Sequence, residues 1–177
     1  YNLQFDITTA EIVYKNNKFI IASKLIGKFN LYNILAAILC CINLGLSIKQ
    51  ISKAINSFSS VPGRFEKFKL PNNKGFAIID YAHSPDAFEN IFKNLKKINK
   101  NKKIISVFGC GGERDQNKRP KMAEIVEKYS EKTIITNDNP RNEDPNKIIK
   151  EILSGFKNQK HTVILNRKKA IINALEN

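Results

Sequence analysis

From residue 63 onward, short apolar runs alternate with patterns that have the spacing of amphipathic helices. Four runs have the length of a strand, and they read GFAII, KKIISVF, KTIIT and HTVIL. A chain that alternates strand and helix through short connections folds as a parallel sheet with helices on its faces. The sequence therefore predicts an α/β fold, with a parallel sheet of four strands and helices on both faces.

The start of the chain has a less regular pattern. Residues 1–29 alternate loosely between apolar and polar side chains, and a hairpin turn is expected at Lys15–Lys18. A helix is expected to follow from about Asn30 to Leu44. Because this helix is apolar on nearly all sides, it is expected to be buried.

A second helix and a clear break follow. Ser47 and Gln50 have the spacing of a capping box, and four apolar residues form one face of the helix behind them: Ile48, Ile51, Ile55 and Phe58. Pro62 and Gly63 then interrupt the pattern. The sequence therefore predicts a domain boundary between residues 1–62 and 63–177.

Composition argues against several classes of function. The net charge of +14 comes mostly from lysines spread along the whole chain, without the clustered arginines and aromatics of a nucleic-acid face, so nucleic-acid binding is not expected. No apolar run reaches the roughly 18–20 residues of a membrane span, so membrane insertion is not expected. Cys40, Cys41 and Cys110 lack metal-binding spacing and are expected to be buried thiols in a reducing cytoplasm.

Polar clusters follow three of the expected strands at their carboxyl ends. They read DYAHSPD, GCGGERDQNKRP and NDNPRNEDP. In open α/β sheets, ligands bind beyond the carboxyl ends of the strands. These three segments are therefore the candidate functional loops.

The second of these segments, residues 109–120, is rich in glycine. A Walker A loop needs lysine and then serine or threonine after its last glycine, where Glu113 and Arg114 stand here. A dinucleotide fingerprint needs a third glycine at the position of Arg114. A simple glycine turn explains the glycines, but not the arginines Arg114 and Arg119 in the same loop. An anion-binding loop is favoured, because guanidinium suits carboxylate and phosphate.

Five segments, in this order and spacing, resemble the Mur ligases: FNLYNILAA, VPGRFE, DYAHSPDA, VFGCGGERDQNKRP and DNPRNEDP. More narrowly they resemble the MurE type, which adds the third residue to the UDP-N-acetylmuramoyl peptide of peptidoglycan. The resemblance implies that residues 1–62 are the strand–helix tail of a P-loop-type ATPase domain. It also implies that residues 63–177 are most of a Rossmann-like C-terminal domain, and that this portion alone is inactive.

The resemblance implies two sets of binding residues. Those facing ATP are Asn30, Asn33, Arg64, Asp80 and His83. Judged from the residues alone, Asn30 is as well explained as a helix N-cap and Asn33 as a satisfied polar residue. Arg64 could equally be an exposed linker arginine, and Asp80 with His83 a cap and turn.

The second set would hold the incoming amino acid. It comprises Arg119 and the run Asp138, Asn139, Pro140 and Arg141. The alternative for this run is an Asx–Pro turn that caps the next helix. No catalytic residue and no metal ligand is implied within the chain.

The implied reaction is ATP-dependent amide bond formation in the cytoplasm. ATP, with Mg²⁺, would phosphorylate the terminal carboxylate of UDP-N-acetylmuramoyl-dipeptide, and the amine of meso-diaminopimelate would attack the acyl phosphate. Two alternatives remain open at this stage. One is the lysine-adding version of the ligase, and the other is a Rossmann-like nucleotide-binding module without ligase activity.

Overall fold

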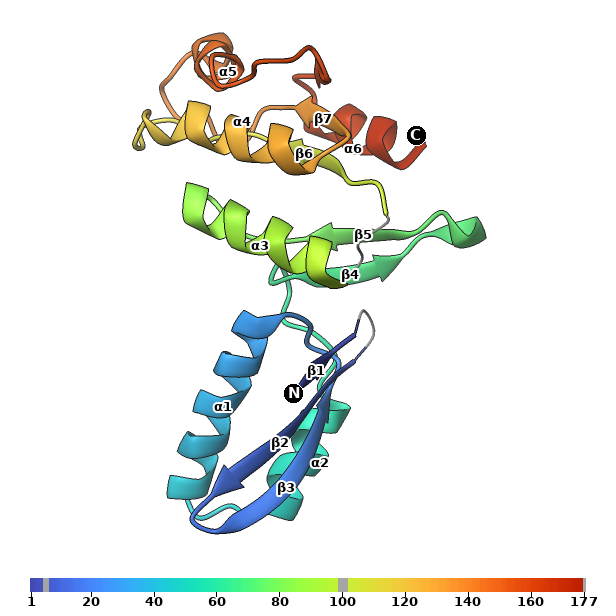
Figure 1. Cartoon of the computed structure of the whole chain (residues 1–177). Helices are drawn as coiled ribbons and strands as arrows, with labels where there is room; N and C mark the ends of the chain where they lie inside the picture. The colour runs from blue at the N-terminus through green and yellow to red at the C-terminus, as the bar shows by residue number, and fades with distance from the viewer. Residues whose placement is uncertain (5–6, 99–101, 177) are drawn as a thin grey trace. The chain divides into compact units, whose positions relative to one another are not determined.

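A computed structural model describes residues 1–4, 7–98 and 102–176 (Figure 1). The chain divides into two compact units. The first contains the described residues of 1–81 and 94–98, and the second contains those of 82–93 and 102–176. In the described part of the chain, no helix is long and apolar enough to cross a membrane.

The first unit opens with a small antiparallel sheet. Its strands lie in the order β1-β2-β3 and span Asn2–Leu3, Thr8–Tyr14 and Asn17–Ser23. Tyr14 pairs with Asn17, which leaves Lys15 and Asn16 as a two-residue turn. Both turn residues have positive φ, 45° and 64°, as a type I′ hairpin requires. The predicted hairpin is therefore confirmed.

Two helices, α1 (Lys28–Asn43) and α2 (Ile48–Ser57), complete this part of the first unit. Together with the strands they form one apolar core, whose buried members are Ala10, Ile21, Leu31, Ile34, Ile38 and Ile51. The expectation that α1 is buried on nearly all sides is wrong: Tyr32 and Leu39 are 59% and 47% exposed. The core occupies one side of the helix, so its apolar residues on other sides remain at the surface.

The predicted capping box at the start of α2 is confirmed. The Ser47 hydroxyl accepts a hydrogen bond from the Gln50 amide (3.4 Å), and the Gln50 side chain accepts one from the Ser47 amide (3.0 Å). Ser47→Ala removes half of this arrangement and should lower the free energy of unfolding by about 1 kcal/mol. Urea unfolding followed by circular dichroism measures the change.

Ser57, at the other end of α2, provides the control. Its hydroxyl donates to the carbonyl of Ala54 within the last turn (3.0 Å), so it caps no free amide. Ser57→Ala should change stability by less than about 0.5 kcal/mol, as exposed substitutions usually do. Equal losses from the two substitutions would contradict a specific role for the cap.

A second hairpin joins β4 (Glu66–Lys69) to β5 (Phe76–Ile79) through a short 3₁₀ helix, η1 (Pro71–Asn73). This corrects one prediction. Within the described residues, β5 pairs antiparallel with β4 and is not a member of the parallel sheet. Gly75, with φ of +119°, lies in the connection. Strand β4 was missed because its sequence, EKFK, lacks an apolar run.

The second unit contains a parallel sheet in the order β6-β7-β8. The strands span Ile105–Phe108, Lys132–Ile135 and His161–Val163. Helices flank the sheet: α4 (Lys118–Tyr129), α5 (Pro145–Leu153), α6 (Arg167–Glu176) and residues 85–93 of α3 (Pro85–Ile98). The predicted α/β class with a parallel sheet is thus confirmed, with three strands in place of four.

The core of the second unit lies between the sheet and its helices. Its fully buried apolar residues come from β7, α4, α5 and α6: Ala123, Val126, Ile134, Ile135, Ile152 and Ala170. Strands that are buried on both faces read as continuous apolar runs, which is why KTII was recognisable as a strand. This rigid centre positions the loops that follow β6 and β7.

Candidate functional site

The loops that follow β6 and β7 are joined at the carboxyl ends of these strands. The amide of Thr136 donates to the carbonyl of Phe108 (2.9 Å), which continues the sheet ladder beyond β7. Further along, the amide of Gly112 donates to the carbonyl of Asn139 (2.8 Å). The structure therefore brings the glycine loop against the DNPR segment, as the positions of the two segments predict.

Gly112 makes this close approach possible. A Cβ atom at Gly112 would lie 1.9 Å from the carbonyl oxygen of Pro140, far inside van der Waals contact. Gly109 is similar, since its Cβ would lie 2.2 Å from the carbonyl oxygen of Thr136. The glycines therefore allow two backbones to touch.

Gly112→Ala tests this packing. Because the obstructing atom belongs to the backbone, we expect the loops to separate and the second unit to lose about 1–3 kcal/mol of stability. Gly111→Ala is the matched control, because its Cβ would meet the flexible end of the Arg141 side chain at 3.1 Å. Thermal unfolding of both variants measures the difference, and a Gly112→Ala protein as stable as Gly111→Ala would contradict the account.

Arg119 is completely buried in the first turn of α4. Its guanidinium donates to both carboxylate oxygens of Glu143 (2.9 and 3.0 Å), to Glu151 (2.5 Å) and to the carbonyl of Gly111 (3.1 Å). These hydrogen bonds, above all those that Arg119 donates to Glu143, raise the pKa of Arg119. The expected contact of Arg119 with an amino acid stays a prediction, because in this structure both terminal nitrogens bind groups of the chain itself.

Glu143 is a site residue that the sequence did not reveal. Besides its pair with Arg119, its carboxylate accepts a hydrogen bond from the backbone amide of Glu113. The pKa of Glu143 falls from 4.5 to about 2, first because of Arg119 and then because of the Glu113 amide. A lowered carboxyl pKa means that these bonds stabilise the fold at neutral pH and are lost as the pH falls from 4.5 towards 2.

The DNPR segment forms a tight turn around Pro140. The carbonyl of Pro140 accepts from the amide of Glu143 (3.0 Å), and the side chain of Asn139 accepts from the amide of Arg141 (3.3 Å). Arg141 has a positive φ of 50°, is exposed, and donates from Nη1 to the carbonyl of Gly112. Asp138, which opens the segment, is also exposed.

The alternative that this turn caps the next helix is wrong. The N-cap of α5 is Asp144, whose side chain accepts a hydrogen bond from the amide of Asn146 (2.9 Å). Pro145 follows as the first residue of the helix, a position where proline is favoured. The DNPR segment is therefore left to present its side chains at the sheet edge.

The residues expected to face ATP lie in two places. In the first unit, Asp80 accepts a hydrogen bond from the amide of Phe65 (2.7 Å), and the amide of Tyr81 donates to the carbonyl of Gly63 (2.8 Å). The guanidinium of Arg64 lies over the ring of Tyr81, 5.4 Å from its centroid. The end of β5 thus brings Arg64 and Asp80 together. Tyr81 was not among the residues expected from the sequence.

Asn30 and Asn33 share one face of α1. Asn30 is buried, its amide group donates to the carbonyl of Ile26 (2.9 Å), and its side-chain oxygen accepts from Asn33 (3.4 Å). The N-cap alternative for Asn30 is wrong, because α1 starts at Lys28 and its N-cap is Gly27. Asn33 is exposed at the surface of the helix.

The start of α1 lies near the Arg64 turn within the first unit. The rings of Phe29 and Phe65 make an edge contact with centroids 5.8 Å apart. Asn30 follows Phe29 directly, and Arg64 precedes Phe65. The first unit therefore brings the segment that carries Asn30 close to the turn that carries Arg64.

His83 belongs to the second unit. Its carbonyl accepts a hydrogen bond from Nζ of Lys118 (2.8 Å), at the start of α4. The neighbouring Ser84 caps α3, because its hydroxyl accepts from the amide of Ala87 (3.3 Å). The exposed His83 therefore lies just before the start of the helix.

Within the described residues, metal-binding side chains do not gather in one place. Among residues 1–4, 7–98 and 102–176, no three His, Cys, Asp or Glu side chains form a cluster that could hold one. Asp80 offers one oriented carboxylate, and Mg²⁺ in nucleotide sites is commonly bound by one or two carboxylates together with phosphate oxygens. Asp80 therefore fits a Mg²⁺ that the nucleotide itself would largely hold.

The cysteines only partly follow the expectation of burial. Cys110 is buried next to Met122 in the second unit, and burial raises its pKa to about 11. Cys41 is half-buried and Cys40 is exposed on α1. Cys40 lies on the side of the helix that the apolar core does not cover.

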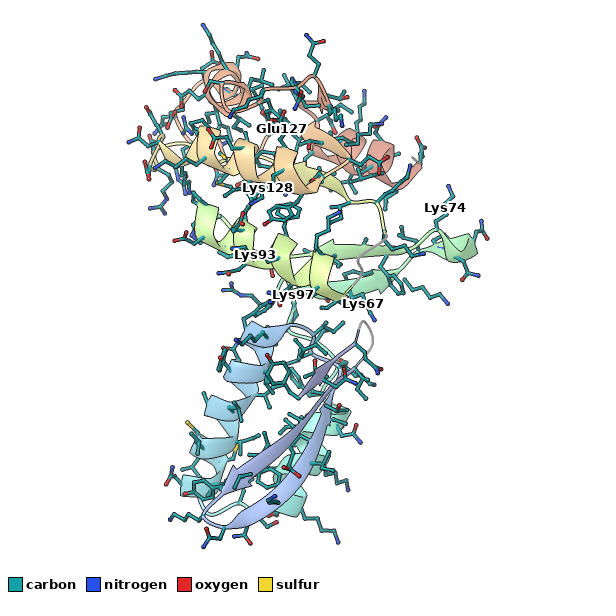
Figure 2. All side chains as sticks on the ribbon, in the orientation of Figure 1. Lys67, Lys74, Lys93, Lys97, Glu127 and Lys128 are labelled. Carbon is teal, nitrogen blue, oxygen red and sulfur yellow. The ribbon has the colours of Figure 1, made fainter. Side chains whose placement is uncertain are left out.

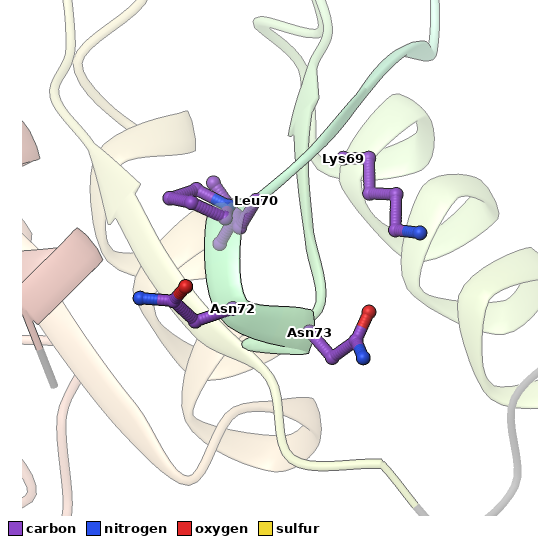
Figure 3. A pocket seen from close by; sticks show the side chains of 5 residues that line it. Lys69, Leu70, Asn72 and Asn73 are labelled. Carbon is purple, nitrogen blue, oxygen red and sulfur yellow. The ribbon is translucent and has the colours of Figure 1, made fainter.

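Two surface features lie apart from these residues. A hollow of about 530 Å³ lies at the β4–β5 connection and is lined by residues 69–73. Its lining side chains, shown in Figure 3, include none of the expected binding residues. Figure 2 labels lysines on several separate elements: Lys67 on β4, Lys74 after η1, Lys93 and Lys97 on α3, and Lys128 on α4. The positive charge is therefore distributed over the elements.

Comparison with known proteins gives consistent relationships. Residues 63–177 match the family model described as "Mur ligase, glutamate ligase domain". The chain is 41% identical, over 95% of its length, to UDP-N-acetylmuramoyl-L-alanyl-D-glutamate--2,6-diaminopimelate ligase 1 of Clostridium acetobutylicum. It is 51% identical, over 76% of its length, to the 2,6-diaminopimelate ligase of Geobacter sulfurreducens. The chain spans 35% and 26% of these two relatives, respectively.

Solved structures give the same relationship. A UDP-N-acetylmuramoyl-L-alanyl-D-glutamate--2,6-diaminopimelate ligase aligns with 96% of this chain and 35% of its own, with TM-score 0.61 and 31% identity. A folylpolyglutamate synthase from Thermotoga maritima aligns with 97% of this chain and 39% of its own, with TM-score 0.78 and 24% identity. The second likeness concerns the fold alone. The family model covers well over half of the sequence, and so this chain belongs to the Mur ligase family.

Proposed function

We propose that the chain is part of a cytoplasmic Mur ligase of the MurE type, which adds meso-diaminopimelate to UDP-N-acetylmuramoyl-L-Ala-D-Glu in peptidoglycan synthesis. ATP, with Mg²⁺, activates the peptide carboxylate as an acyl phosphate, and the amine of diaminopimelate displaces phosphate through a tetrahedral intermediate. The relatives named as 2,6-diaminopimelate ligases support this choice of reaction.

The observation that carries the proposal is the position of Arg141. Its exposed side chain stands on a turn that is fixed to the glycine loop at the carboxyl ends of β6 and β7. Diaminopimelate differs from lysine by a second carboxylate, and guanidinium binds carboxylate as a planar fork. Asp138, Asn139 and Pro140 form the rest of this turn. Arg119, whose guanidinium pairs with Glu143 at the end of the turn, is proposed to bind the amino acid alongside Arg141.

The nucleotide is proposed to bind the other set of residues. Arg64 and Asp80 supply a cation and an oriented carboxylate, and Asn30 and Asn33 supply amides that suit a purine edge. His83 is proposed to contact the phosphates. Positioning and charge stabilisation account for most of the catalysis of phosphoryl transfer, so these roles need no covalent step by the chain.

The domain organisation is proposed in the same terms. Residues 1–62 form the end of the ATPase domain, and residues 63–177 form most of the C-terminal domain. The start of the family match at residue 63 supports this division. The phosphate loop of the ATPase would lie outside these residues, since the 177 residues contain no GxxxxGK[ST] motif.

Product formation by the full-length protein tests the proposal. We expect release of ADP and phosphate that depends on both UDP-N-acetylmuramoyl-dipeptide and meso-diaminopimelate. If lysine replaces diaminopimelate with equal or better efficiency, the lysine-adding alternative is correct. If the protein binds ATP but forms no amide with either amino acid, the nucleotide-binding module is correct.

A further inference from the structure

Glu143 connects three parts of the candidate site, although the sequence did not single it out. Its carboxylate accepts two hydrogen bonds from Arg119 of α4 (2.9 and 3.0 Å) and one from the backbone amide of Glu113 in the glycine loop. Glu143 itself stands at the end of the DNPR turn, where its amide donates to Pro140 (3.0 Å). The side chain of Glu143 thus connects the DNPR turn to the glycine loop and to α4.

The same two loops are joined again around Arg141. The carbonyl of Gly112 accepts from Nη1 of Arg141, and the side chain of Asn142 donates to Glu113 (2.6 Å). Glu113 and Arg141 both have positive φ, 51° and 50°, which non-glycine residues seldom adopt. Such a backbone persists only where surrounding contacts hold it.

Packing does not fix the orientation of the Arg141 side chain. It is exposed, so its orientation depends on the carbonyl of Gly112. The carbonyl of Gly112 and the amide of Glu113 belong to the same peptide group. The amide of Glu113 donates a hydrogen bond to the carboxylate of Glu143. The carboxylate of Glu143 therefore holds one end of a peptide group, and the other end of that group holds the guanidinium of Arg141.

We propose that Glu143 is a positioning residue for amino-acid selectivity: by fixing the Gly112–Glu113 peptide, it aims Arg141 at the second carboxylate of the substrate. This inference rests on the proposed function. If the guanidinium of Arg141 is displaced, it no longer matches the second carboxylate of diaminopimelate. Lysine has no carboxylate at that end, so its binding does not depend on the position of Arg141. Loss of Glu143 should therefore affect diaminopimelate selectively.

The test uses the full-length ligase with the variants Glu143→Gln and Glu151→Gln. Both remove a carboxylate that binds Arg119, but Glu151 contacts no residue of the two loops through its carboxylate in the part of the chain that the structure describes. Glu143→Gln should lower kcat/KM for meso-diaminopimelate about tenfold, as expected when a substrate-binding group is misplaced. Its kcat/KM for lysine and the KM for ATP should change less than about twofold. Glu151→Gln should leave the ratio of the two amino acids within about twofold of the parent value.

A second measurement does not depend on activity. Hydrogen exchange at the amide of Glu113 should become at least about tenfold faster in Glu143→Gln than in Glu151→Gln, because the bond to Glu143 is weakened. If wild-type protein does not use diaminopimelate, the proposed function fails, while this exchange still reports whether Glu143 holds the loop. If Glu143→Gln does not fold, Glu143→Asp, which keeps the charge but shortens the side chain, takes its place with the same expectations.

Two results would overturn the inference. One is an equal loss of selectivity in the Glu143 and Glu151 variants, which would mean that both act only by neutralising Arg119. The other is an unchanged ratio of diaminopimelate to lysine in Glu143→Gln or Glu143→Asp. The second result overturns the inference even if exchange at Glu113 becomes faster, because the loop would then move without consequence for Arg141.

Discussion

In the full-length enzyme, Arg141→Ala is expected to lower kcat/KM for meso-diaminopimelate at least tenfold, because one charge-assisted hydrogen bond contributes about 1.5–3 kcal/mol. The use of lysine should change far less, since lysine offers no second carboxylate. Because Arg141 is exposed, the substitution removes little packing. The fold loses only the hydrogen bond from Arg141 to the carbonyl of Gly112, so the main loss should appear in substrate use.

Arg141→Lys is the matched control. It retains a positive charge but not the planar fork, so it should recover only part of the lost activity. Initial rates with each amino acid, at saturating ATP and UDP-N-acetylmuramoyl-dipeptide, give the two kcat/KM values. An equal fall for diaminopimelate and lysine in Arg141→Ala would refute the selectivity role, and so would a wild-type preference for lysine.

Arg64→Ala is expected to raise the KM for ATP roughly 10- to 150-fold while leaving the KM for diaminopimelate nearly unchanged, because it removes one charged contact to the nucleotide. Arg64 is exposed and lies over the Tyr81 ring, so its charge is available at the surface next to Asp80. The cation–π contact itself contributes only about 0.5–1 kcal/mol at such a site. Stability should therefore change little.

Tyr81→Leu separates the two contributions of this pair. It removes the aromatic ring beneath Arg64 but leaves the charge, so the KM for ATP should rise by only a few fold, in line with about 0.5–1 kcal/mol. Steady-state kinetics with varied ATP measure both variants. If Arg64→Ala has a normal KM for ATP but binds diaminopimelate more weakly, the assignment of Arg64 to the ATP site is refuted.

The parallel sheet was predictable because its signal is local. Strands β6, β7 and β8 carry apolar runs, and each is followed by a helix with recognisable start signals such as Pro145 after Asp144. The partner of β5 was not predictable in the same way. Strand β4 contains two lysines and a glutamate in four residues, so it lacks the apolar run of a strand. It pairs with β5 because the short connection through η1 turns the chain back on itself. The alternation of strand and helix patterns could not show whether β5 pairs within a hairpin or belongs to the parallel sheet.

The candidate site was predictable in its position but not in its internal contacts. Arginines and asparagines after β6 and β7 could be placed at one sheet edge from topology alone. Glu143 and Glu151 were missed because their role depends on where Arg119 is buried, and they lie 24 and 32 residues away in sequence. A buried guanidinium requires carboxylate partners, yet sequence spacing does not say which ones supply them.

The strand order of the parallel sheet has a consequence for how this part of the protein acquires its structure. Strands β6, β7 and β8 lie side by side in the order of synthesis, and a single helix connects each pair. Such near-neighbour pairing keeps contact order low for a parallel sheet and lets the sheet grow one strand at a time on the ribosome. Both loops of the candidate amino-acid site extend from β6 and β7. A nascent chain that has exposed α5 but not yet β8 therefore already carries all the segments that meet around Arg141.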